Sequence, residues 1–122
     1  MRIVLPYPPT VNHYWGQRVI GTGKNARVHT YITKRGVVFR DDVALELCAA
    51  HVEPITGPVR LDIVAHPPDK RRRDLDNILK ALQDALEHGG AFEDDSQVAD
   101  LRIRRAEPVS GGRVDVEIRE EA

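Results

Sequence analysis

Several short segments of the chain alternate apolar and polar residues, and a period of two residues is the pattern of a β-strand with one buried face. Val114, Val116 and Ile118 give the clearest example, with charged residues between them. The alternation predicts strands at residues 2–6, 28–32, 59–65, 98–106 and 113–119. Gly111 and Gly112 directly precede the last strand, and such a glycine pair predicts a hairpin between the last two strands.

Two longer segments instead repeat apolar residues every three or four positions, which is the spacing of an amphipathic helix. The first extends from Thr33, a residue type that caps helices, to Val52. Its predicted apolar stripe consists of Val37, Val38, Val43, Ala44, Leu47 and Ala50. The second helix follows Asp74, has an apolar face from Leu75 to Leu86, and stops at a glycine pair, residues 89–90.

This order of strands and helices favours an α+β fold with a mixed or antiparallel sheet and two main helices. A chain of 122 residues has room for one hydrophobic core and not for two, so we expect a single domain over residues 1–122. Residues 16–25 contain three glycines together with Arg18 and Lys24, which predicts a mobile basic loop.

Composition narrows the class of protein further. A content of 41% hydrophobic and 30% charged residues is typical of an ordered globular protein. No run approaches the roughly 18 apolar residues that a membrane span requires, and the N-terminus lacks a secretory signal, so we expect a cytoplasmic protein without a membrane partner. Cys48 is the only cysteine, which excludes an intrachain disulfide, and we expect it in the core.

The charges are distributed unevenly, although the net charge is only −1. Residues 1–73 contain 12 Lys or Arg and 6 Asp or Glu, a balance of +6, whereas residues 74–122 contain 6 and 13, a balance of −7. This asymmetry indicates one surface for a polyanion and a separate acidic site, unless folding mixes the two sets of charges.

The acidic residues of greatest interest flank the second predicted helix. Asp74 and Asp76 lie where that helix begins, and Asp94 and Asp95 lie in the turn that follows it. A lone Asp at a helix start is often only a cap, and Asp is common in turns, so each pair also has a purely structural interpretation. Two acids crowded into one turn directly after four basic residues favour a functional site instead.

Asp95 cannot reach Asp74 along the helix axis, because a helix of this length spans some 20 Å. If residues 98–104 form a strand that returns beside residues 59–65, the chain between could carry Asp95 towards Asp74 and Asp76. The return of residues 98–104 beside residues 59–65 is an assumption about the fold, because the spacing of the acidic residues does not require it.

Three convergent carboxylates repel one another unless a cation bridges them. Oxygen ligands without His or Cys favour Mg²⁺, for which Mn²⁺ should substitute, and no small-molecule cofactor is expected. If the three side chains do converge, Asp74, Asp76 and Asp95 would be metal ligands and catalytic carboxylates. Lys80 lies four residues beyond Asp76 and could contact that carboxylate or a bound phosphate; an ordinary surface ion pair is an equally good interpretation.

Two basic regions are candidates for contact with DNA. The first consists of Lys70, Arg71, Arg72 and Arg73, which directly precede Asp74 and could hold a phosphodiester backbone beside it. The second consists of Asn12, His13, Tyr14 and Trp15 with Arg18, Lys24 and Arg27, where aromatic rings could stack on exposed bases. Tyr14 and Trp15 could equally pack in the interior of the protein.

The segment from Asp69 through Asp74-Leu75-Asp76-Asn77, continued by Lys80, Asp84-Ala85-Leu86, Gly90, Asp94-Asp95 and Gln97, resembles the RusA family of Holliday-junction resolvases. Pro8-Pro9-Thr10 with Asn12 and Tyr14 is similar to the opening motif of that family. Glu93 departs from the pattern, because relatives often have an apolar residue there.

The resemblance implies an α+β homodimer that binds four-way DNA junctions and cuts them symmetrically with Mg²⁺. It also implies that Asp74, Asp76 and Asp95 bind the metal and that Lys80 assists. A nuclease for other branched DNA, such as flaps or forks, and a non-catalytic DNA-binding protein remain as alternatives.

Overall fold

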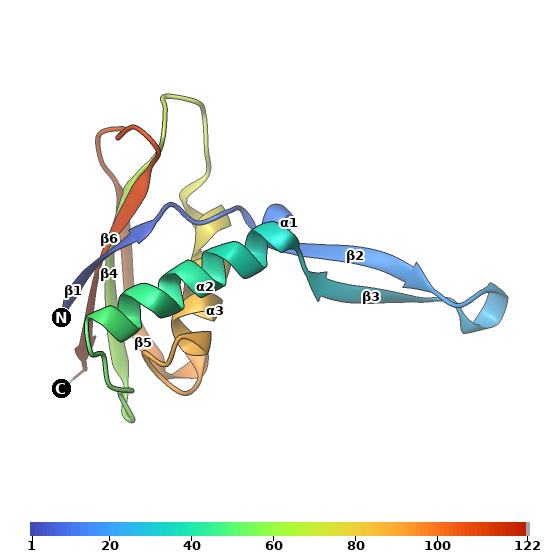
Figure 1. Cartoon of the computed structure of the whole chain (residues 1–122), viewed down its shortest axis with the longest axis horizontal. Helices are drawn as coiled ribbons and strands as arrows, with labels where there is room; N and C mark the ends of the chain where they lie inside the picture. Colours follow the sequence, from blue (N-terminus) through green and yellow to red (C-terminus); the bar gives the residue numbers. More distant parts are fainter. Residues whose placement is uncertain (122) are drawn as a thin grey trace.

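Every strand and both long helices predicted from the sequence are present in the computed structural model, which describes residues 1–121 (Figure 1). In chain order the elements are β1 (Arg2–Pro6), α1 (Val11–Tyr14), β2 (Trp15–Ile20), η1 (Gly23–Asn25), β3 (Arg27–Ile32), α2 (Lys34–Ala49), β4 (Val59–His66), η2 (Leu75–Ile78), α3 (Leu79–His88), η3 (Asp95–Gln97), β5 (Val98–Arg105) and β6 (Arg113–Glu120), where η denotes a 3-10 helix. Within residues 1–121, no helix combines the length and the apolar character that crossing a bilayer demands.

The main sheet has four strands in the order β1-β6-β4-β5. β4 is antiparallel to β6 and parallel to β5, so the sheet is mixed, as predicted. The predicted hairpin between the last two strands is wrong, because β4 lies between them. After β5 the chain continues along β4, where the N–H of Ala106 donates to the carbonyl of Ala65, and then crosses the end of β4 to reach β6. Gly111 and Gly112 do form a turn with positive φ, but it joins strands that are not neighbours.

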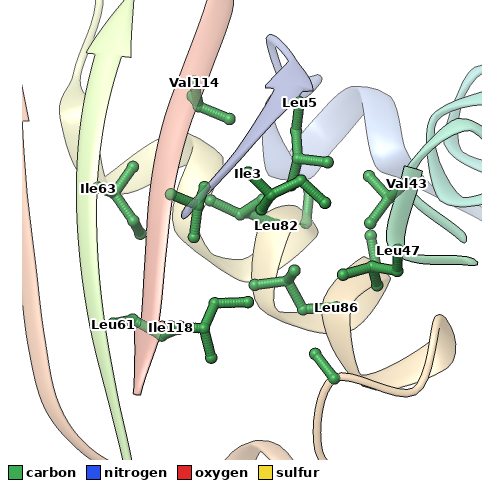
Figure 2. Close-up of a cluster of buried hydrophobic side chains, with 14 of the residues drawn as sticks. Ile3, Leu5, Val43, Leu47, Leu61, Ile63, Leu82, Leu86, Val114 and Ile118 are labelled. Carbon is green, nitrogen blue, oxygen red and sulfur yellow. The ribbon is translucent and has the colours of Figure 1, made fainter. Parts of the chain in front are cut away.

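Only one face of this sheet is covered by helices, which explains the strict alternation in β4 and β6 (Figure 1). Figure 2 shows that Leu82 and Leu86 of α3 lie between Leu61 of β4 and Leu47 of α2. All four of these side chains are buried. Burying a leucine of this kind stabilises a fold by about 1.5–3 kcal/mol, so this layer is the main source of stability.

α2 begins as the sequence predicts, because the Thr33 side chain accepts a hydrogen bond of 3.0 Å from the N–H of Gly36. Its apolar face is rotated from the predicted one. Val43 and Leu47 are buried as expected, but Phe39 is buried in place of Val38, which is 60% exposed. Cys48 is exposed, so its assignment to the core is wrong; it follows Leu47 around the helix onto the solvent side.

Strands β2 and β3 form a separate antiparallel hairpin that projects from the body of the protein (Figure 1). We call residues 15–32 the arm. The mobile loop predicted at residues 16–25 is therefore wrong for its first half, which is strand β2. Most arm residues are exposed on both faces, so no alternation of apolar and polar residues reveals this strand in the sequence.

Candidate active site

The basic loop between β4 and η2 is organised by Asp69. Its carboxylate accepts hydrogen bonds from the backbone N–H of Arg71, at 2.9 Å, and from Nη1 of Arg73, at 2.6 Å. The bond from Arg73 has the largest effect on the pKa of Asp69, and together the two bonds lower it to about 2. Arg105 of β5 donates to the carbonyl of Arg73 at 2.6 Å. The end of the loop is therefore fixed directly in front of Asp74.

Asp74 and Asp76 lie at the start of η2, and both are exposed. Asp74 occupies the N-cap position, yet its side chain makes no cap hydrogen bond. Within residues 1–121 neither carboxylate has a hydrogen-bond or ion-pair partner. The interpretation of Asp74 as a helix cap is therefore not supported, and both carboxylates are available to bind something else.

A cavity of about 590 Å³ lies beside Asp74. One wall comes from the basic loop and η2, and the other from the segment after β1, α1 and the first turn of α2. The lining residues are Tyr7, Pro8, Pro9, Thr10, His13, Arg35, Pro68, Arg71, Arg72, Arg73, Asp74, Asn77 and Ile78. Sequence reasoning singled out the three loop arginines and Asp74. It also placed His13 in the second candidate region for contact with DNA, but it missed Arg35, which belongs to no motif and which only folding brings to this cavity.

A second cavity, of about 660 Å³, lies on the uncovered face of the main sheet. Its charged residues are largely paired with one another, for example Arg2 with Glu117 at 3.2 Å and Arg113 with Asp115 at 3.2 Å. None of the predicted site residues lines it. The chemistry predicted from the sequence therefore belongs to the smaller cavity.

The structure does not bring Asp95 to Asp74 and Asp76 within one chain. β5 does pair with β4, as the sequence analysis assumed, but the two strands are parallel and Val98 lies opposite Val59. Asp95 directly precedes β5, whereas Asp74 follows the far end of β4. α3 separates the two positions. Glu87, which lies beside Asp95, is eleven positions after Asp76, and along a helix this separation corresponds to a rise of about 16 Å.

Asp95 instead lies near the C-terminal end of α3. It belongs to a cluster of three acidic residues, Glu87, Asp94 and Asp95, whose carboxylate oxygens lie within 4.8 Å of one another. Within residues 1–121 this is the group of acidic side chains that lies close enough together to share a metal ion. Glu87 also accepts a hydrogen bond of 3.1 Å from the backbone N–H of Asp95. Asp94 caps η3 by accepting from the N–H of Ser96 at 2.9 Å, and this bond lowers its pKa. The structural interpretation of Asp94 is thus supported, while the Asp95 carboxylate has no such function in this turn.

Lys80 is exposed and forms no ion pair with Asp76 or with any other acid in residues 1–121. Asp76 lies in a 3-10 turn, which has three residues per turn and displaces it from the row of side chains that faces Lys80 on α3. The surface ion pair considered from the sequence is therefore not formed, and the ammonium group of Lys80 is open to solvent on the helix that follows the site.

Tyr14 was predicted to contact DNA, but the fold buries it. Its side chain is fully buried, and its hydroxyl donates a short hydrogen bond to Asp84 of α3. Burial and this bond raise its pKa. The ring packs edge-on against Trp15, with centroids 4.3 Å apart. Of the two interpretations of Tyr14, packing in the interior is therefore correct and stacking on DNA bases is wrong.

The remaining predicted contacts are on the surface. Asn12, Arg18, Lys24 and Arg27 are exposed on α1 and the arm, and Lys70 is exposed in the basic loop but does not line the cavity. The register pairs Arg18 with His29, and alternation places Arg27 and Tyr31 on the same face of the arm. The guanidinium of Arg18 lies 5.7 Å from the centre of the Tyr31 ring. One face of the arm is thus basic and aromatic.

Comparison with known proteins identifies the family of the chain. A family model described as endodeoxyribonuclease RusA matches residues 6–119. The chain belongs to the RusA family. The crossover junction endodeoxyribonuclease RusA of Enterobacteria phage HK97 is 42% identical over 120 residues, covering 98% of this chain and 93% of the relative. The RusA proteins of Escherichia coli K12 and of phage 82 carry the same description and are each 38% identical over 119 residues, covering 97% of this chain and 92% of the relative. The resemblance predicted from the sequence motifs is confirmed.

Proposed function

We propose that this RusA-family chain is a crossover junction endodeoxyribonuclease that hydrolyses phosphodiester bonds at four-way DNA junctions by paired, symmetric cuts. The activity of the relatives that match nearly its whole length, which are crossover junction endodeoxyribonucleases, supports this. The observation that carries the proposal is that Asp74 lines a cavity together with Arg71 and Arg72, and that Asp76 follows it in η2. Both carboxylates are exposed and unpartnered within residues 1–121. Such a site would act in recombination and repair in the cytoplasm, where bacterial and phage DNA is handled.

The donor set at η2 fits a divalent cation. Asp74, Asp76 and Asn77 offer only oxygen ligands, the chemistry that Mg²⁺ prefers, and all three are exposed. We propose that Asp74 and Asp76 bind Mg²⁺, with Mn²⁺ as a substitute. A bound cation of this kind polarises a phosphate and lowers the pKa of a water.

The rest of the site would position the DNA strand. Arg71 and Arg72 are exposed and can pair with phosphate oxygens, although Arg71 also lies in a long, exposed ion pair of 3.9 Å with Asp69. Arg73 is hydrogen-bonded to Asp69 at 2.6 Å and mainly orders the loop. Lys80 is free to neutralise charge that develops on the phosphate during cleavage. Asn12, Lys70 and the basic residues of the arm, Arg18, Lys24 and Arg27, would contact the backbone further from the cut.

We also propose that the chain acts as a homodimer, in which the partner subunit's Asp95 completes the metal site beside Asp74 and Asp76. Within one chain α3 holds Asp95 at the other end, so a site that uses all three carboxylates requires a second chain. A two-fold enzyme also presents two identical sites to a substrate with two equivalent strands.

The direct test is cleavage of a synthetic mobile four-way junction, a flap and a linear duplex of matched length, each with Mg²⁺ or with EDTA. We expect symmetric cuts in the junction alone, and only with Mg²⁺. Equal cutting of the flap would favour the broader branched-DNA nuclease. Binding of the junction with no cutting in either Mg²⁺ or Mn²⁺ would favour the non-catalytic DNA-binding protein.

A variant separates catalysis from binding. Asp76→Asn should fold and bind the junction with unchanged or higher affinity, because a repulsive charge beside the phosphate is removed, and should lose cleavage by at least a hundredfold. Asp42→Asn, which removes an exposed acid on α2 far from the cavity lining, is the matched control. Unimpaired cleavage by Asp76→Asn would rule out the assignment.

A further inference from the structure

The cavity beside Asp74 has two walls that the sequence separates widely. The basic loop supplies Arg71 and Arg72, and the first turn of α2 supplies Arg35 on the other side, next to His13 of α1. The loop was recognisable as a basic run before a pair of acids. Arg35 carries no such signal, and its relation to the cavity exists only in the folded chain.

The position of Arg35 is unfavourable for the helix itself. A cation in the first turn of a helix opposes the positive end of the helix dipole. The first turn of α2 contains no acidic residue, and the chain has none at all before Asp41. Within residues 1–121 Arg35 forms no ion pair or side-chain hydrogen bond. Its charge is therefore uncompensated at a wall of a cavity that is already basic, a combination that suits a bound anion.

We infer that Arg35 binds a phosphate of the DNA strand from the wall opposite Arg71 and Arg72, so that the cavity clamps one strand between two sets of cations. The inference rests on the proposed function and deepens it. The planar guanidinium holds two phosphate oxygens in a fixed bidentate geometry, whereas a lysine ammonium acts as a point charge without that directional preference, so Arg35 fixes the orientation of the strand as well as its affinity. Arg35 also lies three residues after the end of β3, so it is at the base of the arm as well as at the cavity.

Lys34 offers a matched control. It is the preceding residue, has the same charge, lies in the same helical turn and is exposed, but it does not line the cavity. Both Lys34→Gln and Arg35→Gln remove a cation from the N-terminal turn, so both should leave the unfolding temperature unchanged or slightly higher. Only Arg35→Gln should remove a phosphate contact.

The experiment measures the dissociation constant of a labelled four-way junction in EDTA between 50 and 300 mM salt, for wild type, Arg35→Gln, Arg35→Lys and Lys34→Gln. We expect Arg35→Gln to bind about tenfold more weakly. The slope of the logarithm of the dissociation constant against the logarithm of the salt concentration should decrease by the amount that corresponds to about one phosphate contact. Arg35→Lys should recover the salt dependence but only part of the affinity. Lys34→Gln should match wild type.

Equal losses in Arg35→Gln and Lys34→Gln would overturn the inference, because they would reflect net charge and not a site. An unchanged dissociation constant for Arg35→Gln, with wild type that binds and cuts junctions in the same preparation, would also overturn it and leave the proposed function standing. A wild-type chain that neither binds nor cuts junctions would overturn both.

Discussion

At the scale of single residues, the site depends on which charges are already neutralised within the chain. Asp69 and Arg73 are bonded to each other, and Asp94 caps η3. Asp74, Asp76 and Arg35 have no such partner among residues 1–121. Residue type does not distinguish these two groups, since each contains aspartate and arginine. The difference lies in geometry, and it separates residues that build the site from those that can bind a ligand.

The bond between Asp69 and Arg73 predicts a pH dependence of stability. The pKa of Asp69 is about 2 in the folded chain, against an ordinary value of 3.8. A lowered pKa means that the ionised group stabilises the fold above pH 3.8 and that this contribution disappears as the pH falls towards 2. The free energy of unfolding of Asp69→Asn, measured in urea, should therefore fall below that of wild type at pH 5–7, and the difference should shrink on acidification.

Asp42→Asn is the control for this measurement, because the Asp42 carboxylate is exposed and has no partner among residues 1–121. A difference between wild type and Asp69→Asn that stays constant from pH 7 to pH 2 would contradict the prediction. Asp69 is exposed, so we expect the effect to be small but its direction to be clear.

At the scale of elements, the start of α2 connects the arm, α1 and the cavity. Thr33 caps the helix and also donates its hydroxyl to the carbonyl of His13 at 2.6 Å. Gly36 lies so close to α1 that a Cβ there would be 2.5 Å from the carbonyl oxygen of Tyr14. These contacts set the position of Arg35 and of the base of the arm relative to the basic loop.

Gly36→Ala tests this packing. Alanine favours a helix over glycine by about 1 kcal/mol, but the added methyl would collide with the backbone of α1, so we expect a net destabilisation of about 1–3 kcal/mol in urea unfolding. Gly57→Ala is the matched control, because a Cβ at Gly57 meets no atom within 4 Å and its φ is not positive. Equal stability of the two variants would contradict the close approach.

The arm permits a test of its two faces. Arg18 and Arg27 lie on the basic face, whereas Val19 and Val28 form an exposed cross-strand pair on the other. Replacing both arginines by Gln should reduce the salt dependence of junction binding by about two phosphate contacts. Replacing both valines by Thr should leave it unchanged. A loss of the same size in both double variants would show that the arm contributes shape and not charge.

At the scale of the whole molecule, the central fact is that α3 separates two acidic groups. Asp74 and Asp76 lie before its first turn, and Asp95 lies beside Glu87 near its last turn. A single chain therefore offers two carboxylates at the start of η2, of which Asp74 lines the cavity. The proposed site with three carboxylates forms only if Asp74 and Asp76 of one chain are joined by the partner subunit's Asp95.

Mixing two inactive variants distinguishes the arrangements. If the partner subunit's Asp95 completes each site, a dimer of one Asp76→Asn chain and one Asp95→Asn chain contains one intact site and one doubly substituted site. Co-expressed chains should then regain nicking of a junction, although each variant alone is inactive. If each site used acids of one chain only, both sites of the mixed dimer would be defective and no activity would return.

The sequence alone determined the two long helices, most of the strands and the family, and it was enough to propose the chemistry of the site. Helices and half-buried strands follow from the spacing of apolar residues, which is a local property, and Asp74, Asp76 and the basic loop are adjacent in the chain. Tertiary structure decided what depends on distant contacts: that β5 pairs in parallel with β4, that Tyr14 is buried, that strand β2 exists, and that Arg35 faces the basic loop. Neither an exposed strand nor the choice of a neighbouring strand leaves a periodic signal, because the free energy that selects them comes from packing between segments far apart in the chain.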